Sequence, residues 1–295
     1  MKKFLVLMCA TLFLLEGCMM AGESGGQNAG KVTPDPAKKL KVMIGVDFEG
    51  IAGVVTFPEI YSDHPYFMRN VKELTAEVNA AVEGALAAGA TEIIVRDGHG
   101  ADQNVDPFAL HPEAKLINGR MPNTPQTMVM GIDSTYDALI FIGAHAMAGK
   151  QVGILSHTMS LKVEDYKLNG VSMGECPYNA LYAGQFGVPV VFVSGDDVTC
   201  GEARQFFGDI ETVETKVALG RTCAVNHSSG QVCREIKEGV EKALRGLPAT
   251  GKVFTMDKPY KMEVWVRDTP DSPRKYITVT SDTLMTVMQA FWDAI

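Results

Sequence analysis

The chain alternates between short apolar runs and longer segments in which apolar residues recur every three or four positions. Four runs that are rich in β-branched residues have the length of strands, and they cover residues 41–47, 92–97, 138–143 and 188–193. The segment between the first two carries the apolar stripe of a helix, formed by Val71, Leu74, Val78, Val82 and Leu86.

Later segments continue the same alternation. Residues 175–186 and 231–247 have helical character, and two short strand patterns near 264–265 and 277–279 precede a final helix from about residue 283. Nearly all-apolar strands separated by helices are typical of a sheet that is buried on both faces. We therefore predict an α/β fold with a mainly parallel central sheet, helices on both faces and room for a small C-terminal lobe. Residues 39–295 are expected to form this domain.

The first 38 residues differ in pattern from the rest. Two lysines precede an apolar run at 4–15, which is typical of a secretory signal peptide and too short to span a bilayer comfortably. Glu16, Gly17 and Cys18 then follow. A small residue before a cysteine resembles the signal of bacterial lipoproteins, in which the cysteine is acylated, although Glu16 departs from that pattern. We expect a signal peptide at 1–17, a flexible tether at 18–38 and an exported protein, either periplasmic or a cell-envelope lipoprotein. The alternative is a soluble secreted protein that is cut slightly later.

Charge excludes one class of partner. The 295 residues carry 27 Lys and Arg against 35 Asp and Glu, so the formal net charge is −8. A chain this acidic, with no basic stripe, lacks the electrostatic footprint that nucleic-acid binding requires. It also lacks a basic amphipathic segment for anionic lipid, so we expect membrane contact only through an anchor at Cys18.

Four of the six cysteines lie outside the first 38 residues: Cys176, Cys200, Cys223 and Cys233. Export makes disulfides possible, and Cys223 with Cys233 is the first pair to consider. Four cysteines allow three pairings, between which the sequence does not choose. None has the spacing of a metal finger, and we expect most of them to be small buried residues.

Potential metal ligands follow three of the predicted strands, and one more begins the helix at 175. They are Asp47 and Glu49, Asp97 and His99, His145, and Glu175. Because ligands bind beyond the carboxyl ends of strands in open α/β sheets, we expect these side chains to meet in one crevice. Carboxylate and imidazole together suit zinc, manganese or iron, and a shared carboxylate could hold two ions about 3.5–4 Å apart. The alternative is that the carboxylates cap helices and the histidines are ordinary loop residues.

Other polar residues carry less specific signals. Asp97 can orient His99 or cap a turn, and the pair Asp196 and Asp197 can brace the crevice or cap the next helix. Three histidines precede a proline or lie in a polar turn, and we expect surface loops for them: His64, His111 and His227.

Six short motifs occur in an order and at a spacing that resemble one enzyme family. The first is Val-Asp-Phe-Glu-Gly-Ile-Ala-Gly, and the six cover residues 46–53, 97–99, 143–146, 156–159, 174–175 and 193–197. Together they resemble the binuclear zinc D-aminopeptidases that are encoded with dipeptide-transport genes in bacteria. The resemblance covers most of the chain from residue 41 to about 197.

The resemblance implies a site and an activity. It makes Asp47 the carboxylate shared by two Zn²⁺ ions, and the remaining ligands Glu49, His99, His145 and Glu175. It makes His157 the catalytic residue, as a general base or a group that stabilises the oxyanion. The implied reaction is release of N-terminal amino acids, D-amino acids in this family, from short peptides such as those containing D-alanine. The family also forms large ring-like homo-oligomers.

Some features depart from the family pattern and leave other functions open. Gly98 stands where the family often has serine, Cys176 directly follows Glu175, and the export signal differs from a cytoplasmic location. An exported, lipid-anchored protein that binds peptides or metal without turnover is one alternative. A two-metal hydrolase of another ester or amide substrate, such as a phosphate ester, is another. The sequence leaves open the substrate, its stereochemistry, the metal used in the cell and the oligomeric state.

Overall fold

The computed structural model describes residues 39–121, 124–270 and 273–295. Residues 39–295 group into one compact unit. The predicted signal peptide at 1–17 and tether at 18–38 lie outside the described residues.

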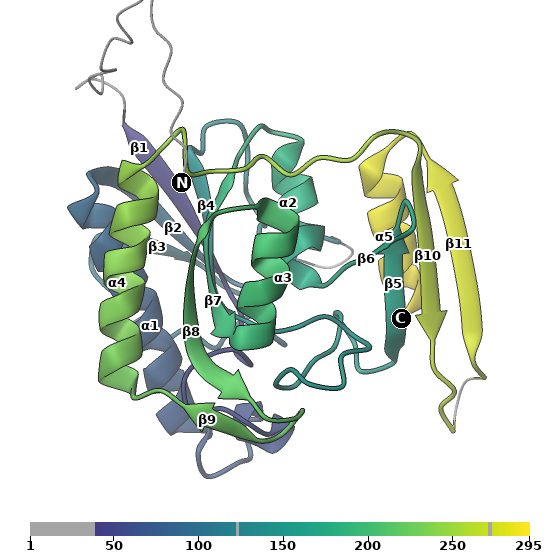
Figure 1. Ribbon diagram of the computed structural model, residues 1–295, viewed down its shortest axis with the longest axis horizontal. Helices are drawn as coiled ribbons and strands as arrows, with labels where there is room; N and C mark the ends of the chain where they lie inside the picture. The colour runs from purple at the N-terminus through teal and green to yellow at the C-terminus, as the bar shows by residue number, and fades with distance from the viewer. Residues whose placement is uncertain (1–38, 122–123, 271–272) are drawn as a thin grey trace, which may run out of the picture. The chain divides into compact units, whose positions relative to one another are not determined.

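A seven-stranded sheet forms the centre of the fold (Figure 1). Its strands are β1 (Leu40–Val46), β2 (Ala90–Asp97), β3 (Ala114–Ile117), β4 (Ala138–Ala144), β7 (Val190–Asp196), β8 (Glu211–Ala218) and β9 (Ala224–Asn226). The strand order is β3-β2-β1-β4-β7-β8-β9, and every pairing is parallel except that of β9 with β8. The predicted mainly parallel central sheet is confirmed.

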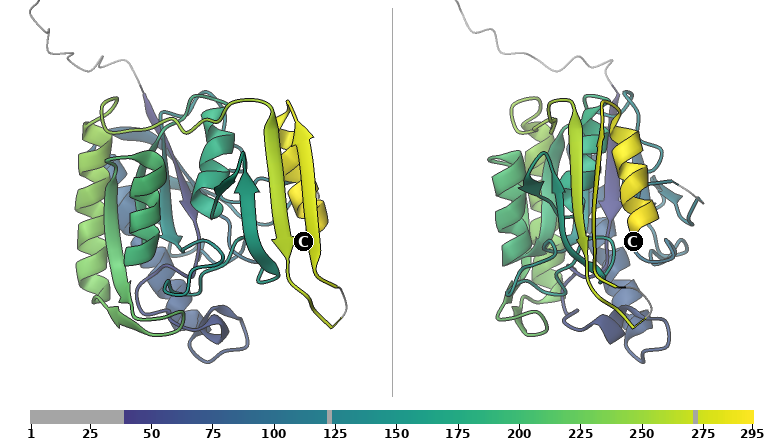
Figure 2. Two further views of the ribbon diagram at one scale, coloured as in Figure 1. Left: turned by 45° about the vertical axis from the view of Figure 1, so that its right-hand side comes forward. Right: turned by 90° about the vertical axis from the view of Figure 1, so that its right-hand side faces the viewer.

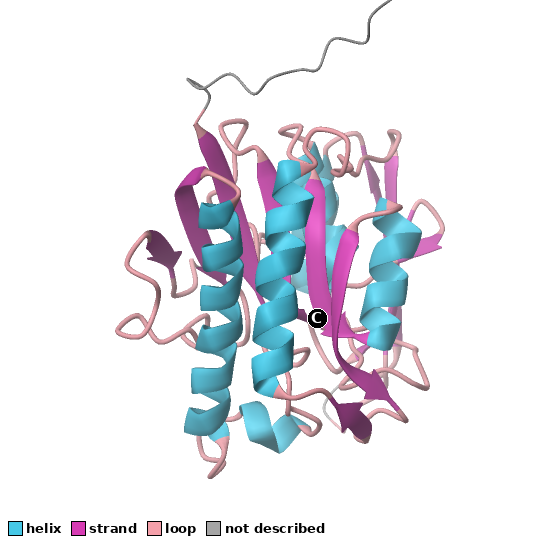
Figure 3. Ribbon diagram, turned by 60° about the vertical axis from the view of Figure 1, so that its left-hand side comes forward, coloured by secondary structure: helices cyan, strands magenta, loops and turns pink. Residues whose placement is uncertain are grey.

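Helices cover both faces of this sheet, as predicted. The two long helices α1 (Phe67–Ala87) and α4 (Ser229–Arg245) pack side by side on one face (Figure 3). The other face is covered by α2 (Glu175–Gly184) and α3 (Asp197–Phe207). Alternate residues of each strand point to opposite faces, so Ile44 packs on the side of α1 and α4 while Met43 packs on the side of α2 and α3. No helix of the described residues is long and apolar enough to cross a membrane.

A second, four-stranded antiparallel sheet lies beside the α2 side of the molecule (Figure 2). It consists of β5 (Val163–Leu168), β6 (Val171–Ser172), β10 (Tyr260–Val266) and β11 (Lys275–Ser281), and α5 (Leu284–Ala294) packs on β10 and β11. The rings of Tyr166, Tyr178 and Phe291 lie 4.5–5.8 Å apart and join this sheet to α2 and α5. The expected C-terminal lobe therefore exists, but two of its strands come from the middle of the chain.

The order of the central sheet defines where a ligand can bind. From β1 the chain builds β2 and β3 to one side, then returns to add β4, β7 and β8 on the other. The connections therefore reverse between β1 and β4, and open α/β sheets bind ligands in the crevice at such a reversal. Asp47 follows β1 directly and His145 follows β4 directly.

The four described cysteines are free thiols. Cys176 and Cys200 are buried, Cys233 is half-buried and Cys223 is exposed. The disulfide between Cys223 and Cys233 that the sequence suggested is therefore not formed. Only two of the four cysteines are buried, whereas we expected most of them to be.

Candidate metal centre

The loop after β1 carries two buried carboxylates, Asp47 and Glu49, against the end of β4. Asp47 N donates a hydrogen bond to Ile142 O (2.9 Å), and Gly50 N donates to Gly143 O (2.8 Å). A Cβ on Gly50 would lie 1.8 Å from Ala144 O, so only glycine permits this approach. The contact brings the carboxylates of the first loop next to the histidine that follows β4.

Two histidines contact these carboxylates. His99, after β2, places Nδ1 3.1 Å from Asp47 Oδ1 and 3.0 Å from Glu49 Oε2. His145, after β4, places Nε2 3.3 Å from Asp47 Oδ2 and 3.2 Å from Oε1 of Glu175, which is the first residue of α2. Each carboxylate oxygen of Asp47 therefore faces a different histidine.

The side chains form three overlapping groups, two of which share Asp47. In each group, one donor atom per residue lies within 4.8 Å of the others: Asp47, Glu49 and His99 in the first, and Asp47, His145 and Glu175 in the second. A third group of Glu49, His145 and His157 overlaps both. The structure thus brings together all five predicted ligands and the predicted catalytic histidine.

The donor atoms of this cluster fit a metal cation. Asp47 Oδ2, Glu49 Oε2 and His145 Nε2 are buried and make no hydrogen bond of acceptable geometry. Buried polar atoms in proteins are almost always paired, so such orphans point to a bound ion. His145 Nδ1 lies 3.0 Å from the carbonyl oxygen of Ala146, which can only accept. A proton therefore stays on Nδ1, and in the neutral ring the lone pair of Nε2 faces the carboxylates, as a metal-binding imidazole requires.

The electrostatics of the cluster point the same way. Burial and the neighbouring charge of Glu49 raise the pKa of Asp47 to about 7. Burial alone would lower the pKa of His99, but the carboxylates of Glu49 and Asp47 outweigh it and raise that pKa well above its usual value. Three buried carboxylates thus need positive charge beside them, which protonated imidazoles or bound cations can supply.

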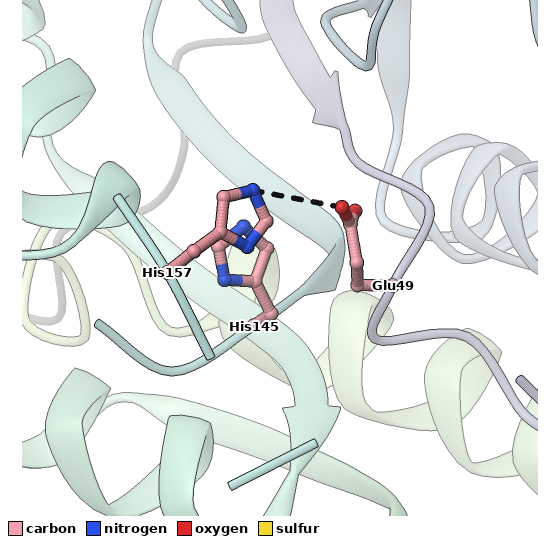
Figure 4. Close-up of side chains that lie close together, drawn as sticks. All are labelled: Glu49, His145 and His157. Atoms are coloured by element: carbon pink, nitrogen blue, oxygen red, sulfur yellow. Dashed lines mark ion pairs between the residues drawn. The ribbon is translucent and has the colours of Figure 1, made fainter. Parts of the chain in front are cut away.

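His157 lies against the cluster without belonging to either of the two groups that share Asp47. Its ring stacks on His145, with centroids 4.0 Å apart and planes 6° apart, and Nε2 is 3.7 Å from Glu49 Oε1 (Figure 4). The same Nε2 is also 3.7 Å from Glu175 Oε1. Nδ1 is 2.8 Å from Leu155 O, so the neutral ring carries its lone pair on Nε2, on the side of the carboxylates. Burial and the charge of His145 lower the pKa of His157.

Backbone strain accompanies the loop that carries His157. Leu155 and Met159 flank it two positions away on either side, with φ of 52° and 60°, which non-glycine residues rarely adopt. Met159 N also donates a 2.7 Å hydrogen bond to Glu175 Oε1. Strained residues persist where the surrounding structure determines their conformation, and they cluster at functional sites.

The cluster opens into a cavity of about 250 Å³. Besides the residues already described, its walls include Phe57, Tyr61, Arg120, Thr127, Leu161 and Trp292. The volume lies just below the range of about 300–1,000 Å³ that is typical of pockets for drug-sized ligands, which suits a small substrate. Sequence reasoning missed Arg120 and Trp292, because neither belongs to a motif nor follows a predicted strand.

The remaining candidates lie outside the cluster. Asp97 accepts hydrogen bonds from the backbone N–H groups of Asn104 and Val105, so it caps a turn and does not orient His99. Asp196 is the N-cap of α3 and accepts from Thr199 N (2.8 Å). The three other histidines belong to none of the metal-binding groups formed by described residues, and all lie in turns or loops: His64, His111 and His227.

The fold and the cluster define the chain as an α/β protein with a buried carboxylate–histidine centre. A family model described as D-aminopeptidase matches residues 40–280. The chain therefore belongs to the D-aminopeptidase family of peptidases, and the resemblance seen in the motifs is confirmed.

Individual relatives extend this comparison. The D-aminopeptidase of Bacillus subtilis (strain 168) is 32% identical over 220 residues, which cover 75% of this chain and 79% of the relative. A solved structure, described as the Zn-dependent D-aminopeptidase DppA from Bacillus subtilis, a self-compartmentalizing protease, superposes with a TM-score of 0.80 at 28% identity. That match covers 86% of this chain and 96% of the solved chain.

Proposed function

We propose that this protein is a zinc-dependent aminopeptidase that releases N-terminal D-amino acids from short peptides. The observation that carries the proposal is the pair of donor groups that share Asp47, one completed by Glu49 and His99 and the other by His145 and Glu175. A related chain of known structure is described as a Zn-dependent D-aminopeptidase, and the family model is described as D-aminopeptidase.

The residues divide the chemical work between them. Asp47 would help to hold both zinc ions. The remaining ligands would be Glu49, His99, His145 and Glu175. When bound, the two ions would polarise the scissile carbonyl and make water a nucleophile near neutral pH. In neutral His157 the lone pair of Nε2 faces the cluster, so Nε2 can accept a proton from the water that attacks the peptide bond. His157 would later return that proton to the leaving amine.

Assembly and location belong to the same proposal. The relative of known structure is described as self-compartmentalizing, which supports a closed homo-oligomer for this chain too. The signal pattern at 1–17 and Cys18 supports export and lipid anchoring, with 18–38 as a tether. An enzyme in the cell envelope would meet peptides that contain D-alanine. Labelling of Cys18 with a radioactive fatty acid, or processing that the inhibitor globomycin blocks, would test the lipid anchor. Cys18→Ser is the control variant, and we expect it to lose the label.

The decisive experiment measures metal and stereoselectivity together. The protein is purified without chelator, metal per chain is quantified, and release of D-alanine and of L-alanine is assayed on matched dipeptides. We expect about two zinc ions per chain, D-selective release, and an inactive, metal-poor His145→Ala variant. Two bound zinc ions with no release of either amino acid would contradict the proposed peptide substrate. Stoichiometric binding of peptide or metal without any product would favour a binding protein, and cleavage of phosphodiesters alone would favour a phosphoesterase.

A further inference from the structure

Among the described residues that line the cavity of the candidate metal centre, one side chain is permanently positively charged. Three lining residues are carboxylates of the cluster, namely Asp47, Glu49 and Glu175, whereas Arg120 is the only lysine or arginine. The side chain of Arg120 is 50% exposed, while that of Glu175 is only 11% exposed. The cluster therefore lies at the floor of the cavity and Arg120 at its mouth.

The positive charge of Arg120 is not cancelled by its nearest carboxylate. Asp102 Oδ1 lies 3.3 Å from Arg120 Nη2, but Asp102 Oδ2 lies 2.6 Å from Nη2 of Arg96, a completely buried guanidinium. One carboxylate thus serves two cations. The other hydrogen bond of Arg120 to described residues runs from the same Nη2 to Gly100 O (2.6 Å). Nε and Nη1 donate no hydrogen bond to a described residue, so their N–H groups can donate to an anion.

Trp292 of α5 fixes this guanidinium beside the cavity. Arg120 Cζ lies 5.8 Å from the centroid of the indole ring, within the range of cation–π attraction. The indole itself is held, because its Nε1 donates to Pro125 O (3.1 Å) and to Tyr178 Oη (3.0 Å). Arg120, Thr127 and Trp292 also line a neighbouring cavity of about 190 Å³, so they form the boundary between the two spaces.

The chemistry of a short peptide complements this arrangement. If the peptide bond is broken at the cluster, the part of a dipeptide beyond that bond extends toward the mouth and ends in a carboxylate. Among the described residues that line the cavity, only Arg120 offers this carboxylate a permanently charged cationic side chain. We propose that Arg120 binds the C-terminal carboxylate of the substrate and makes the enzyme selective for short peptides with a free C-terminus. This inference rests on the proposed function and names the substrate class of the same site.

The test compares D-alanyl-D-alanine with its C-terminal amide, using the zinc-loaded protein. We expect wild type to favour the free acid by about 10- to 100-fold in kcat/KM, the usual range for a hydrogen bond to a charged group. Arg120→Gln should remove this preference by raising KM for the acid, with kcat/KM for the amide almost unchanged. Arg120→Lys, which keeps the positive charge but has a different donor geometry, should retain part of the preference that Arg120→Gln loses. The matched control is Arg245→Gln, an exposed arginine at the end of α4.

Each other outcome has a definite meaning. An equal loss on both substrates in Arg120→Gln would assign Arg120 to the structure of the cavity wall and overturn the inference. Equal use of acid and amide by wild type would overturn it as well. Hydrolysis of neither substrate by protein that contains two zinc ions would contradict the proposed function itself, and the inference would fall with it.

Discussion

Lys216 Nζ lies 2.8 Å from the carbonyl oxygen of Glu49, although 167 positions separate the two residues. Lys216 is completely buried in β8, and its ammonium also donates to Ile51 O and Val54 O, both at 2.6 Å. A lysine has three donors, and here each has an acceptor in the loop that carries the predicted ligands. Lys216 therefore fixes the backbone on which the Glu49 carboxylate stands.

Replacing Lys216 with methionine should destabilise the fold and weaken the metal centre. The substitution leaves three carbonyl groups without their donor, and a buried unsatisfied group costs about 1–3 kcal/mol. We expect a loss of about 3 kcal/mol or more in the free energy of unfolding, measured by denaturant titration, and a lower zinc content after dialysis. Lys242→Met, at an exposed position on α4, is the control. Unchanged stability in Lys216→Met would show that these hydrogen bonds contribute little.

The shared position of Asp47 predicts how metal stoichiometry responds to mutation. Asp47→Ala removes a donor from both groups, so both zinc ions should be lost. Glu49→Gln and Glu175→Gln each weaken one group, and we expect about one zinc ion per chain in each. Mass spectrometry of the metal content measures this directly, with exposed Glu113→Gln as the control. Retention of one ion in Asp47→Ala would contradict a shared carboxylate.

Substitution of His157 should separate catalysis from metal binding. Because His157 lies outside both groups that share Asp47, His157→Ala should keep its zinc and lose activity. A positioned acid–base residue contributes about 10²–10⁴-fold, and we expect a loss of that size in kcat. Kinetics and metal analysis of the same preparation measure both quantities, beside the loop variant His227→Ala. If zinc is lost together with activity, His157 is a ligand.

Glu77 of α1 predicts the pH dependence of stability. Its carboxyl group is completely buried, and burial raises its pKa to about 8 even though Oε1 accepts a hydrogen bond from Ala52 N (2.7 Å). Folded protein therefore keeps a proton that the unfolded chain releases above about pH 4.5, and stability from this group falls as the pH rises from there to about 8.

The variant Glu77→Gln isolates this contribution. Glutamine keeps the acceptor and cannot ionise, so the variant should gain stability relative to wild type as pH rises. We expect a difference of at least about 1 kcal/mol at pH 8 that vanishes near pH 4.5, measured by denaturant unfolding across that range. Glu83→Gln, on the exposed face of the same helix, should leave the profile unchanged. Parallel profiles for wild type and Glu77→Gln would contradict the prediction.

The sequence alone could predict the central sheet and the residues that gather at its edge. Asp47, His99 and His145 each come just after an apolar run with the length of a strand, and parallel strands bring their carboxyl ends to one edge. To place Glu175 in the same group, one also had to expect that the helix after Gly174 begins at this edge of the sheet. Asp97 shows the limit of such reasoning, because a position next to a ligand does not reveal whether its side chain faces the crevice or a turn.

Other parts of the molecule left no local signal. Strand β8 has the sequence Glu-Thr-Val-Glu-Thr-Lys-Val-Ala, in which charged and polar residues obscure a strand that is largely buried. The acceptors of Lys216 lie 162–167 positions away, so no pattern around the lysine identifies them. Arg120 and Trp292 meet only because α5 packs near the cavity. Contacts between residues this far apart depend on tertiary structure, which periodicity does not encode.

The close backbone contact between the loop after β1 and the end of β4 has a consequence for metal binding. A side chain at Gly50 would overlap the backbone at the end of β4, and one at Gly143, whose φ is 71°, would come within 2.3 Å of Asp47 O. Main-chain packing therefore sets the backbone positions of Asp47 and His145 relative to one another. A metal ion that binds between their side chains would meet donors whose backbone is already in place, so little conformational entropy of the main chain would be lost on binding.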